Sequence, residues 1–169
     1  SSTINQLSIG DALAISTLNQ KKISKKDFKK FHPSGNLGAK LRTVEEIMII
    51  GNKIPFVNGN LIMKKALQII SNKKLGILVV RNSKGITIGV ITDGQIRRFN
   101  EVNDNLQSLT VKEVMTLSPI SIDKETLVEK ALSIMNSKKI TSLCVHSKKN
   151  LKKTVGILHI HKILETNIN

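Results

Sequence analysis

Apolar side chains recur at helical spacing in two separate parts of the chain. In residues 62–70 they lie three or four positions apart, as on the buried face of an amphipathic helix. The same spacing returns in residues 127–135, where Thr126 and Glu129 have the separation of a capping box at a helix start. The pattern therefore predicts two amphipathic helices, the second beginning near Thr126.

Two β-rich runs follow each of these predicted helices. They occupy residues 76–80 and 86–92 after the first helix, and residues 142–145 and 154–160 after the second. Polar residues typical of a turn separate the two runs of each pair, and a short helical stretch follows the second run. The predicted order, a short strand or turn, a helix, two strands and a helix, thus occurs twice.

The residues themselves repeat along with this pattern. Three stretches of the first copy return in the second: "VEEIM" (44–48) as "VKEVM" (111–115), "KKALQIISNKK" (64–74) as "EKALSIMNSKK" (129–139), and "TIGVIT" (87–92) as "TVGILH" (154–159). The separation is 67 residues for the first and third stretches and 65 for the second, as short loop insertions would produce. A unit of about 65 residues therefore occurs twice.

The first 43 residues belong to neither copy. Residues 8–22 predict a helix with Ser8 as its N-cap, and residues 24–31 predict a second short helix. His32 precedes a proline, which biases its backbone toward an extended conformation. A segment this short cannot form a core of its own, so we expect it to be the tail of a larger upstream domain.

Composition narrows the class of protein. Hydrophobic residues make up 40% of the chain, which excludes a disordered tail, and no apolar run approaches the roughly 20 residues that span a bilayer. The single cysteine, Cys144, excludes an internal disulfide framework and is typical of a reducing compartment. We therefore expect a cytoplasmic protein that does not interact with membranes, in which Cys144 is a small buried apolar residue.

The net charge of +15 raises the question of nucleic-acid binding. The excess is nearly all lysine, in pairs scattered along the chain. There is no Trp or Tyr and there are only four Phe, so surfaces on which bases stack are scarce. We therefore expect solvated lysines and no nucleic-acid partner.

The duplicated pattern resembles a tandem pair of cystathionine-β-synthase (CBS) domains. The resemblance is carried by the starts "VEEIM" and "VKEVM", the strands "LGILVV" and "ITSLCV", and the endings "GVITDGQIRR" and "GILHIHKILE". It implies an α+β fold in which two β-α-β-β-α units, CBS domain 1 at 44–103 and CBS domain 2 at 111–169, pack sheet against sheet. Clefts between the units bind nucleotides or related ligands in this family.

The ligand motif departs from the family's pattern. That pattern is Gly, two apolar residues, Thr or Ser, two further residues and Asp, with the Thr facing phosphate and the Asp holding ribose hydroxyls. The first copy keeps Thr92 but has Gln95 at the Asp position, and the second copy has His159 and Lys162 at these positions. A carboxylate accepts two hydroxyl hydrogen bonds, whereas glutamine accepts fewer and lysine accepts none. An ordinary adenosine site is therefore not expected, and a purely structural, oligomerising pair is the alternative to a ligand sensor.

His159 and His161 lie two residues apart at the end of the last predicted strand. Three roles are open for these histidines: they are ligand-facing donors in the cleft, metal ligands, or a cap of the last helix. Two histidines without a third ligand are weak evidence for a metal site. We favour ligand-facing donors, with no metal and no cofactor. Arg97 either reaches an anionic ligand or is a solvated charge. The residues expected to contact the ligand are Thr92, Asp93, Gln95, Arg97, Thr141, Ser142, His159, His161 and Lys162.

The N-terminal segment carries a second resemblance. "GDALAISTL" (10–18) and "DFKKFHPSGNLGAKL" (27–41), followed at once by the CBS pair, are similar to the D-arabinose 5-phosphate isomerase family. In that family a sugar-isomerase (SIS) domain ends in a His-Pro-Gly-Gly-x-Leu-Gly motif. Ser34 replaces the first glycine of that motif, and Lys162 replaces the aspartate of the family's His-x-His-Asp. The resemblance implies that residues 1–43 are the C-terminal tail and linker of an α/β SIS domain.

The reaction implied by this resemblance interconverts D-ribulose 5-phosphate and D-arabinose 5-phosphate, on the route to 3-deoxy-D-manno-octulosonate (Kdo) for lipopolysaccharide. His32 matches a family candidate for the proton transfer, and packing at a domain junction is its alternative role. The other catalytic groups are expected upstream, so this chain alone should be inactive. The expected small-molecule partners are a regulator, CMP-Kdo or a related nucleotide, and the sugar-phosphate substrate in the longer enzyme. We also expect the chain to assemble with further copies of itself: two CBS pairs form a dimer, and the longer enzyme forms a tetramer.

Overall fold

The structure is a computed structural model, and it describes residues 2–21, 41–103 and 105–167. The chain divides into two units, Ser1–Leu41 and Arg42–Asn169, and each is described by itself. His32 and the helix predicted at residues 24–31 lie outside the described residues.

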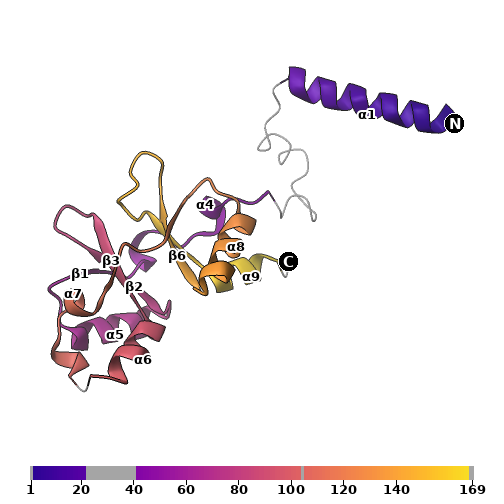
Figure 1. The fold of residues 1–169 in the computed structure, drawn as a ribbon. Helices are drawn as coiled ribbons and strands as arrows, with labels where there is room; N and C mark the ends of the chain where they lie inside the picture. The colour runs from indigo at the N-terminus through magenta and orange to yellow at the C-terminus, as the bar shows by residue number, and fades with distance from the viewer. Residues whose placement is uncertain (1, 22–40, 104, 168–169) are drawn as a thin grey trace. The chain divides into compact units, whose positions relative to one another are not determined.

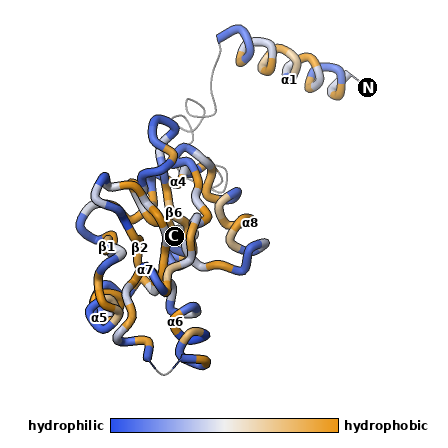
Figure 2. Tube along the Cα trace, turned by 60° about the vertical axis from the view of Figure 1, so that its left-hand side comes forward, coloured by the Kyte–Doolittle hydropathy of each residue, from blue (hydrophilic) through white to orange (hydrophobic). Residues whose placement is uncertain are grey.

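The described part of the first unit is a helix, α1 (Ser2–Gln20), shown in Figure 1. The prediction that this helix begins with Ser8 as its N-cap is wrong, because Ser8 lies inside the helix and its Oγ donates to the carbonyl of Ile4 at 2.9 Å. A serine in a helix interior often bonds back to the preceding turn in this way. Figure 2 shows apolar and polar residues alternating along α1. Its exposed large apolar side chains are Ile4, Leu7, Ile9, Leu13, Ile15 and Leu18.

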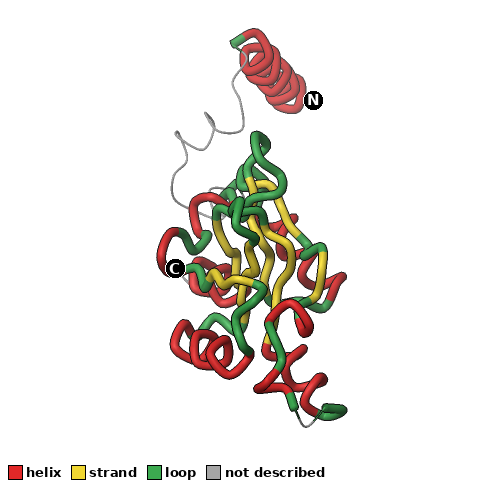
Figure 3. Tube along the Cα trace, turned by 90° about the vertical axis from the view of Figure 1, so that its left-hand side faces the viewer, coloured by secondary structure: helices red, strands yellow, loops and turns green. Residues whose placement is uncertain are grey.

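The second unit contains two sheets, which lie in the middle of the unit with helices around them (Figure 3). The first has the order β1-β2-β3-β4, with β1 parallel to β2 and the remaining neighbours antiparallel. The second has the order β5-β6-β7, with β5 parallel to β6 and β6 antiparallel to β7. The strands are β1 (Phe56–Asn58), β2 (Ile77–Arg81), β3 (Thr87–Thr92), β4 (Thr116–Leu117), β5 (Ser121–Asp123), β6 (Ser142–His146) and β7 (Gly156–His159).

Each sheet packs against a longer and a shorter helix. These helices are α5 (Met63–Lys73) and α6 (Asp93–Asn100) on the first sheet, and α8 (Val128–Lys138) and α9 (Ile160–Asn167) on the second. The buried residues of α5 are Met63, Ala66 and Ile70, which have the spacing of one helix face. The two amphipathic helices and the order of elements predicted from the sequence are therefore confirmed.

Two further short helices, α4 (Val44–Ile47) and α7 (Val111–Val114), begin at capping boxes. In α4 the backbone N–H and the Oγ1 of Thr43 both donate to Glu46 Oε1 at 2.9 Å, and Thr110 and Glu113 make the equivalent bonds in α7. The capping box predicted at Thr126 is wrong. Helix α8 begins two residues later, and the carbonyl of Thr126 instead accepts the N–H of Val44 at 2.8 Å.

That bond is part of an exchange of segments between the two copies. Helix α4 belongs to the first copy, yet Val44 lies in the core formed by α8, β6 and β7 of the second. Conversely, α7 belongs to the second copy but packs into the core of the first. The backbone follows the same exchange, because Ile49 pairs with Ile157 of β7, and β4 pairs with β3. The core of each copy is therefore completed by the first helix of the other copy.

The sheets face each other across a third apolar cluster, which includes Ile77, Val79, Cys144 and Ile157. Cys144 is 2% exposed, as expected for a small apolar residue. Burial raises the pKa of its thiol to about 11 against the opposing effect of a hydrogen bond with Thr154, so the thiol is protonated at neutral pH. The expected α+β arrangement with the sheets packed together is confirmed.

A pair of threonines marks the pseudo-twofold relation between the copies. Thr87 and Thr154 occupy equivalent repeat positions, and Thr87 Oγ1 donates to Thr154 Oγ1 at 2.8 Å. The backbone N–H of Thr154 in turn donates to Thr87 Oγ1 at 3.1 Å. The turns that join β2 to β3 and β6 to β7 therefore lie at the same end of the unit, and the starts of β2 and β6 lie at the other.

Candidate functional site

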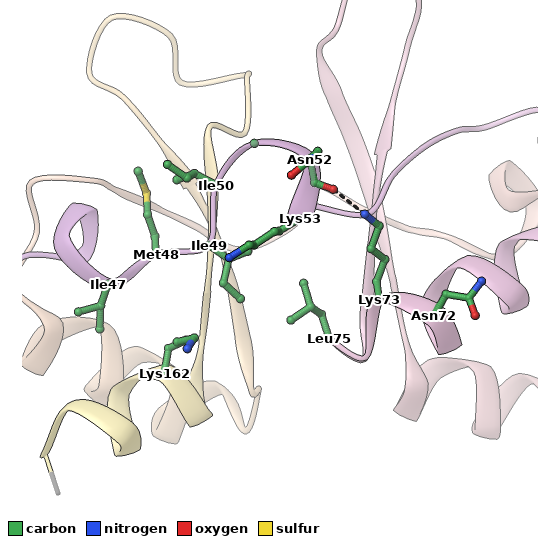
Figure 4. Close-up of a pocket in the computed structure, with 11 residues that line it drawn as sticks. Ile47, Met48, Ile49, Ile50, Asn52, Lys53, Asn72, Lys73, Leu75 and Lys162 are labelled. Atoms are coloured by element: carbon green, nitrogen blue, oxygen red, sulfur yellow. Dashed lines mark hydrogen bonds between the residues drawn. The ribbon is translucent and has the colours of Figure 1, made fainter. Parts of the chain in front are cut away.

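A cleft of about 660 Å³ lies where the exchanged segment of the first copy meets the last helix of the second. The segment includes the 3-10 helix η1 (Gly51–Lys53), and the end of α5 closes the other side. Figure 4 shows Lys162 on α9 facing the exchanged segment, with Lys73 and Leu75 on the opposite side. The lining residues are Ile47, Met48, Ile49, Ile50, Gly51, Asn52, Lys53, Asn72, Lys73, Leu75 and Lys162.

Among the described residues, the charge of the cleft comes from three lysines, Lys53, Lys73 and Lys162, and none of the lining residues is acidic. Lys73 Nζ donates to the carbonyl of Asn52 at 2.5 Å, which ties the end of α5 to η1. Lys162 Nζ is 2.5 Å from Glu165 Oε2, and both side chains are about half exposed. An exposed ion pair of this kind contributes little stability, so Lys162 can exchange its partner for an anionic ligand at small cost.

The rest of the cleft is apolar or amide in character. Met48, Ile49 and Leu75 provide hydrophobic surface, and Asn52 and Asn72 provide side-chain amides that both donate and accept. A ligand that combines a planar or aliphatic part with anionic groups fits such a lining.

Of the residues predicted to contact a ligand, Lys162 alone lines this cleft. Four others gather beside it at the junction of β6, β7 and α9. The carbonyl of Thr141 accepts the N–H of Ile160 at 2.9 Å, Ser142 pairs with His159 across β6 and β7, and the rings of His159 and His161 stack with centroids 4.9 Å apart.

Strand β7 ends at His159, so the two histidines do not share the face of a continued strand. Instead, Nδ1 of His159 accepts the backbone N–H of His161 at 3.2 Å, which makes His159 a cap for the start of α9. Burial, and secondarily the charge of His161, lower the pKa of His159 and favour the neutral ring that this bond requires. The described residues contain no group of three His, Cys, Asp or Glu side chains arranged to hold a metal ion.

The remaining predicted residues, Thr92, Asp93, Gln95 and Arg97, lie in the first copy around α6 and do not line the cleft. Thr92 caps α6, because its Oγ1 accepts the N–H of Gln95 at 3.4 Å. The side chain of Gln95 donates to the carbonyl of Val114 in α7. Asp93 packs beside Gly76, and Arg97 is exposed. The structure therefore separates these residues from Lys162.

Sequence reasoning missed Lys53, Lys73 and the η1 loop as cleft residues. One feature of the sequence could have pointed to the η1 loop. The separation between the repeats changes from 67 to 65 residues, which means that the first copy has two extra residues between "VEEIM" and "KKAL". Helix η1 lies in that interval. The lysines themselves carry no such signal, because they resemble the other paired lysines of the chain.

Among the described residues, no helix is long and apolar enough to span a membrane. Curated relatives match almost the full chain. It is 40% identical over 166 residues to arabinose 5-phosphate isomerase KdsD of Francisella tularensis, covering 98% of this chain and 50% of that protein. It is 35% identical over 160 residues to arabinose 5-phosphate isomerase KpsF of Escherichia coli, covering 94% and 48%. The chain thus spans about half the length of these relatives.

The solved structure of CBSX2 in complex with AMP has a TM-score of 0.64 at 22% identity, covering 75% of this chain and 96% of that chain. CBSX2 is a CBS-pair protein from Arabidopsis thaliana, and the likeness confirms the fold. The family model of the CBS domain matches twice, at residues 44–101 and 111–168. The chain therefore belongs to the CBS domain family, as a tandem pair.

Proposed function

We propose that the chain is the ligand-sensing CBS pair of a D-arabinose 5-phosphate isomerase, an enzyme of the cytoplasm that interconverts D-ribulose 5-phosphate and D-arabinose 5-phosphate. The proposal is supported by the relatives of that name and by the order of the N-terminal segment and the CBS pair. In this proposal the aldose–ketose chemistry belongs to the longer protein, and the CBS pair adjusts it in response to a metabolite.

The lysines that line the cleft support the choice of ligand in this proposal. The described lining residues carry three ammonium groups and no carboxylate, which favours a ligand with more than one anionic group. The activated end product of a route that begins with arabinose 5-phosphate, CMP-Kdo, has a phosphate and a sugar-acid carboxylate. Its cytosine and sugar offer the planar and aliphatic surface that Met48, Ile49 and Leu75 can cover.

AMP is the natural comparison, because CBSX2 binds it. In this chain Lys162 stands where the family pattern has the aspartate that holds ribose hydroxyls. The substitution removes two hydrogen-bond acceptors and adds a positive charge. It therefore disfavours a ligand recognised through its ribose and favours one recognised through its anionic groups.

Isothermal titration calorimetry on the 169-residue chain tests this proposal with CMP-Kdo, CMP, AMP and ATP. CMP-Kdo is expected to bind most tightly. Lys53→Ala and Lys162→Ala are each expected to weaken binding by about 1–3 kcal/mol, the cost typical of leaving a polar partner unsatisfied. Lys130→Ala, an exposed change outside the cleft, serves as the control and should bind as the parent does. AMP binding equal to or tighter than that of CMP-Kdo would contradict the ligand assignment.

The second candidate function is a purely structural pair. It is supported by Gln95, whose bond to the carbonyl of Val114 fixes α7 against the first copy without any ligand. Absence of heat with every nucleotide, together with unchanged thermal stability in their presence, would favour this role. A structural pair is expected to assemble, so sedimentation of the chain would then show a dimer of CBS pairs.

A further inference from the structure

A second cavity, of about 170 Å³, lies at the end of the sheets where the two turns meet. Its polar lining includes the side chains of Thr87, Ser118, Ser121, His146 and Lys152. It shares no lining residue with the cleft around Lys162, and it lies near the last residue of β6 and the first residue of β3.

The cavity exists because the two copies differ at two equivalent positions. In the first copy the guanidinium of Arg81 lies over the ring of Phe56, 2.9 Å from the ring centroid, and its Nη2 donates to the carbonyl of Thr154 at 3.0 Å. The second copy has Ser121 and His146 at the positions of Phe56 and Arg81. A serine leaves the volume of the aromatic ring unfilled, and an imidazole is shorter than the arginine side chain.

The second copy also has two extra residues in its turn between β6 and β7, where the repeat separation returns from 65 to 67. This longer turn brings Leu151 and Lys152 to the cavity. The hydroxyls of Ser118 and Ser121 make no hydrogen bond to any described residue, and none of the described residues that line the cavity is acidic. The lining therefore offers hydroxyl, imidazole and ammonium donors on several sides.

His146 is backed by a carboxylate outside the cavity. Its Nδ1 lies 4.0 Å from Asp123 Oδ2, and both atoms are buried without a hydrogen-bond partner among the described residues. The ring's other nitrogen, Nε2, is the one that remains for a ligand. A ligand held at Nε2 would fix the ring while its Nδ1 stays beside Asp123.

We propose that this cavity binds an oxyanion of the size of phosphate, either free or as the terminal phosphate of a small ester. The volume is several times the ~30 Å³ that one water occupies in the liquid, which leaves room for the anion and part of an attached carbon chain. The site is separate from the nucleotide cleft, and it does not depend on which ligand the cleft takes.

The test is an NMR titration of the 169-residue chain with inorganic phosphate, followed at the imidazole nitrogens of His146 and at the amide of Ser121. A saturable shift of both signals is expected. Ser121→Phe restores the residue of the first copy and should weaken binding at least tenfold by filling the cavity. Lys162→Ala changes the other site and should leave the titration unaltered.

Further variants keep the test decisive if the phenylalanine disturbs folding. Ser121→Val fills less of the cavity and His146→Asn removes the imidazole, and each should weaken phosphate binding at least fivefold in a protein that still unfolds cooperatively. A pentose 5-phosphate that binds more tightly than inorganic phosphate would identify an ester as the ligand, and a neutral pentose should not bind. A response that stays linear in phosphate concentration, or that is equal in parent, Ser121→Val and His146→Asn proteins, would overturn the proposal.

Discussion

The sulfur of Met48 occupies the space that a side chain on Gly156 would need. Met115 is placed in the same way against Gly89, with its sulfur 2.7 Å from the position a Cβ would take. The methionines end the "VEEIM" and "VKEVM" stretches, and the glycines lie in β7 and β3. Each repeated start therefore contacts the repeated strand of the opposite copy, which explains why these two motifs occur together.

Gly156→Ala is expected to destabilise the second unit by about 1–3 kcal/mol, because an added methyl group must displace Met48 or the backbone carbonyl of Ile49, only 3.2 Å away. Urea unfolding measures the change. Gly10→Ala is the matched control, because nothing lies within 4 Å of a Cβ at Gly10 in α1. An equal loss in both variants would show that the Met48 contact is not the cause.

Val44→Ala is expected to lower the free energy of unfolding by about 2–3 kcal/mol, the sum of lost burial and a residual cavity. Val44 is fully buried in the core of the second copy, although it belongs to the first. Hydrogen exchange should therefore lose protection first in α8 and β6. Val102→Ala, at a side chain that is 79% exposed, should change nothing. Loss of protection centred on α5 would contradict the exchange of segments.

His159→Ala should cost about 1 kcal/mol of stability at pH 8, as loss of other N-caps does, and His159→Asn should retain most of it. The pKa of His159 is lowered in the folded state, so its contribution is full above the unfolded value near 6.5 and is lost as the pH falls through the folded pKa. Urea unfolding from pH 8 to pH 5 should show the parent and His159→Ala converging toward acid. A constant difference across this range would exclude the cap role.

In the longer protein that we propose to be an isomerase, His32→Ala is expected to lower kcat by about 10²–10⁴-fold if the histidine transfers a proton during isomerisation. His32→Gln should be equally impaired, because it keeps the size and polarity but not the basicity. A near-normal kcat in both variants would assign His32 to packing. The 169-residue chain itself should show no turnover of arabinose 5-phosphate, and measurable turnover would place the active site within it.

The duplication made the fold predictable, because apolar spacing and repeated motifs both report which side chains face a core. The exchange of α4 and α7 was not predictable in this way. Val44 and Val111 are equivalent residues, and nothing in their own sequence says which of the two cores each one enters.

The candidate site was predicted only in part, for a related reason. The family's motif directs attention to the ends of β3 and β7, where Thr92 and His159 turn out to cap helices. The cleft is lined mainly by the segment before β1, which has no motif of its own and differs between the copies. Lys162, which lines the cleft, was among the predicted ligand contacts because it belongs to the motif. Lys53, which also lines the cleft, was not predicted because it lies outside the motif.

The crossing of α4 to the second copy also sets the order of events during synthesis. Val44 leaves the ribosome more than a hundred residues before Leu158, its partner in the core, so α4 has no place to pack until β7 has emerged. Contacts between residues so distant along the chain slow folding, and an unpaired apolar segment meanwhile invites aggregation. The first copy waits only for α7, because its core runs from Val57 to Met115, so this half can become native before the second, whose core needs Val44 together with residues 122–163.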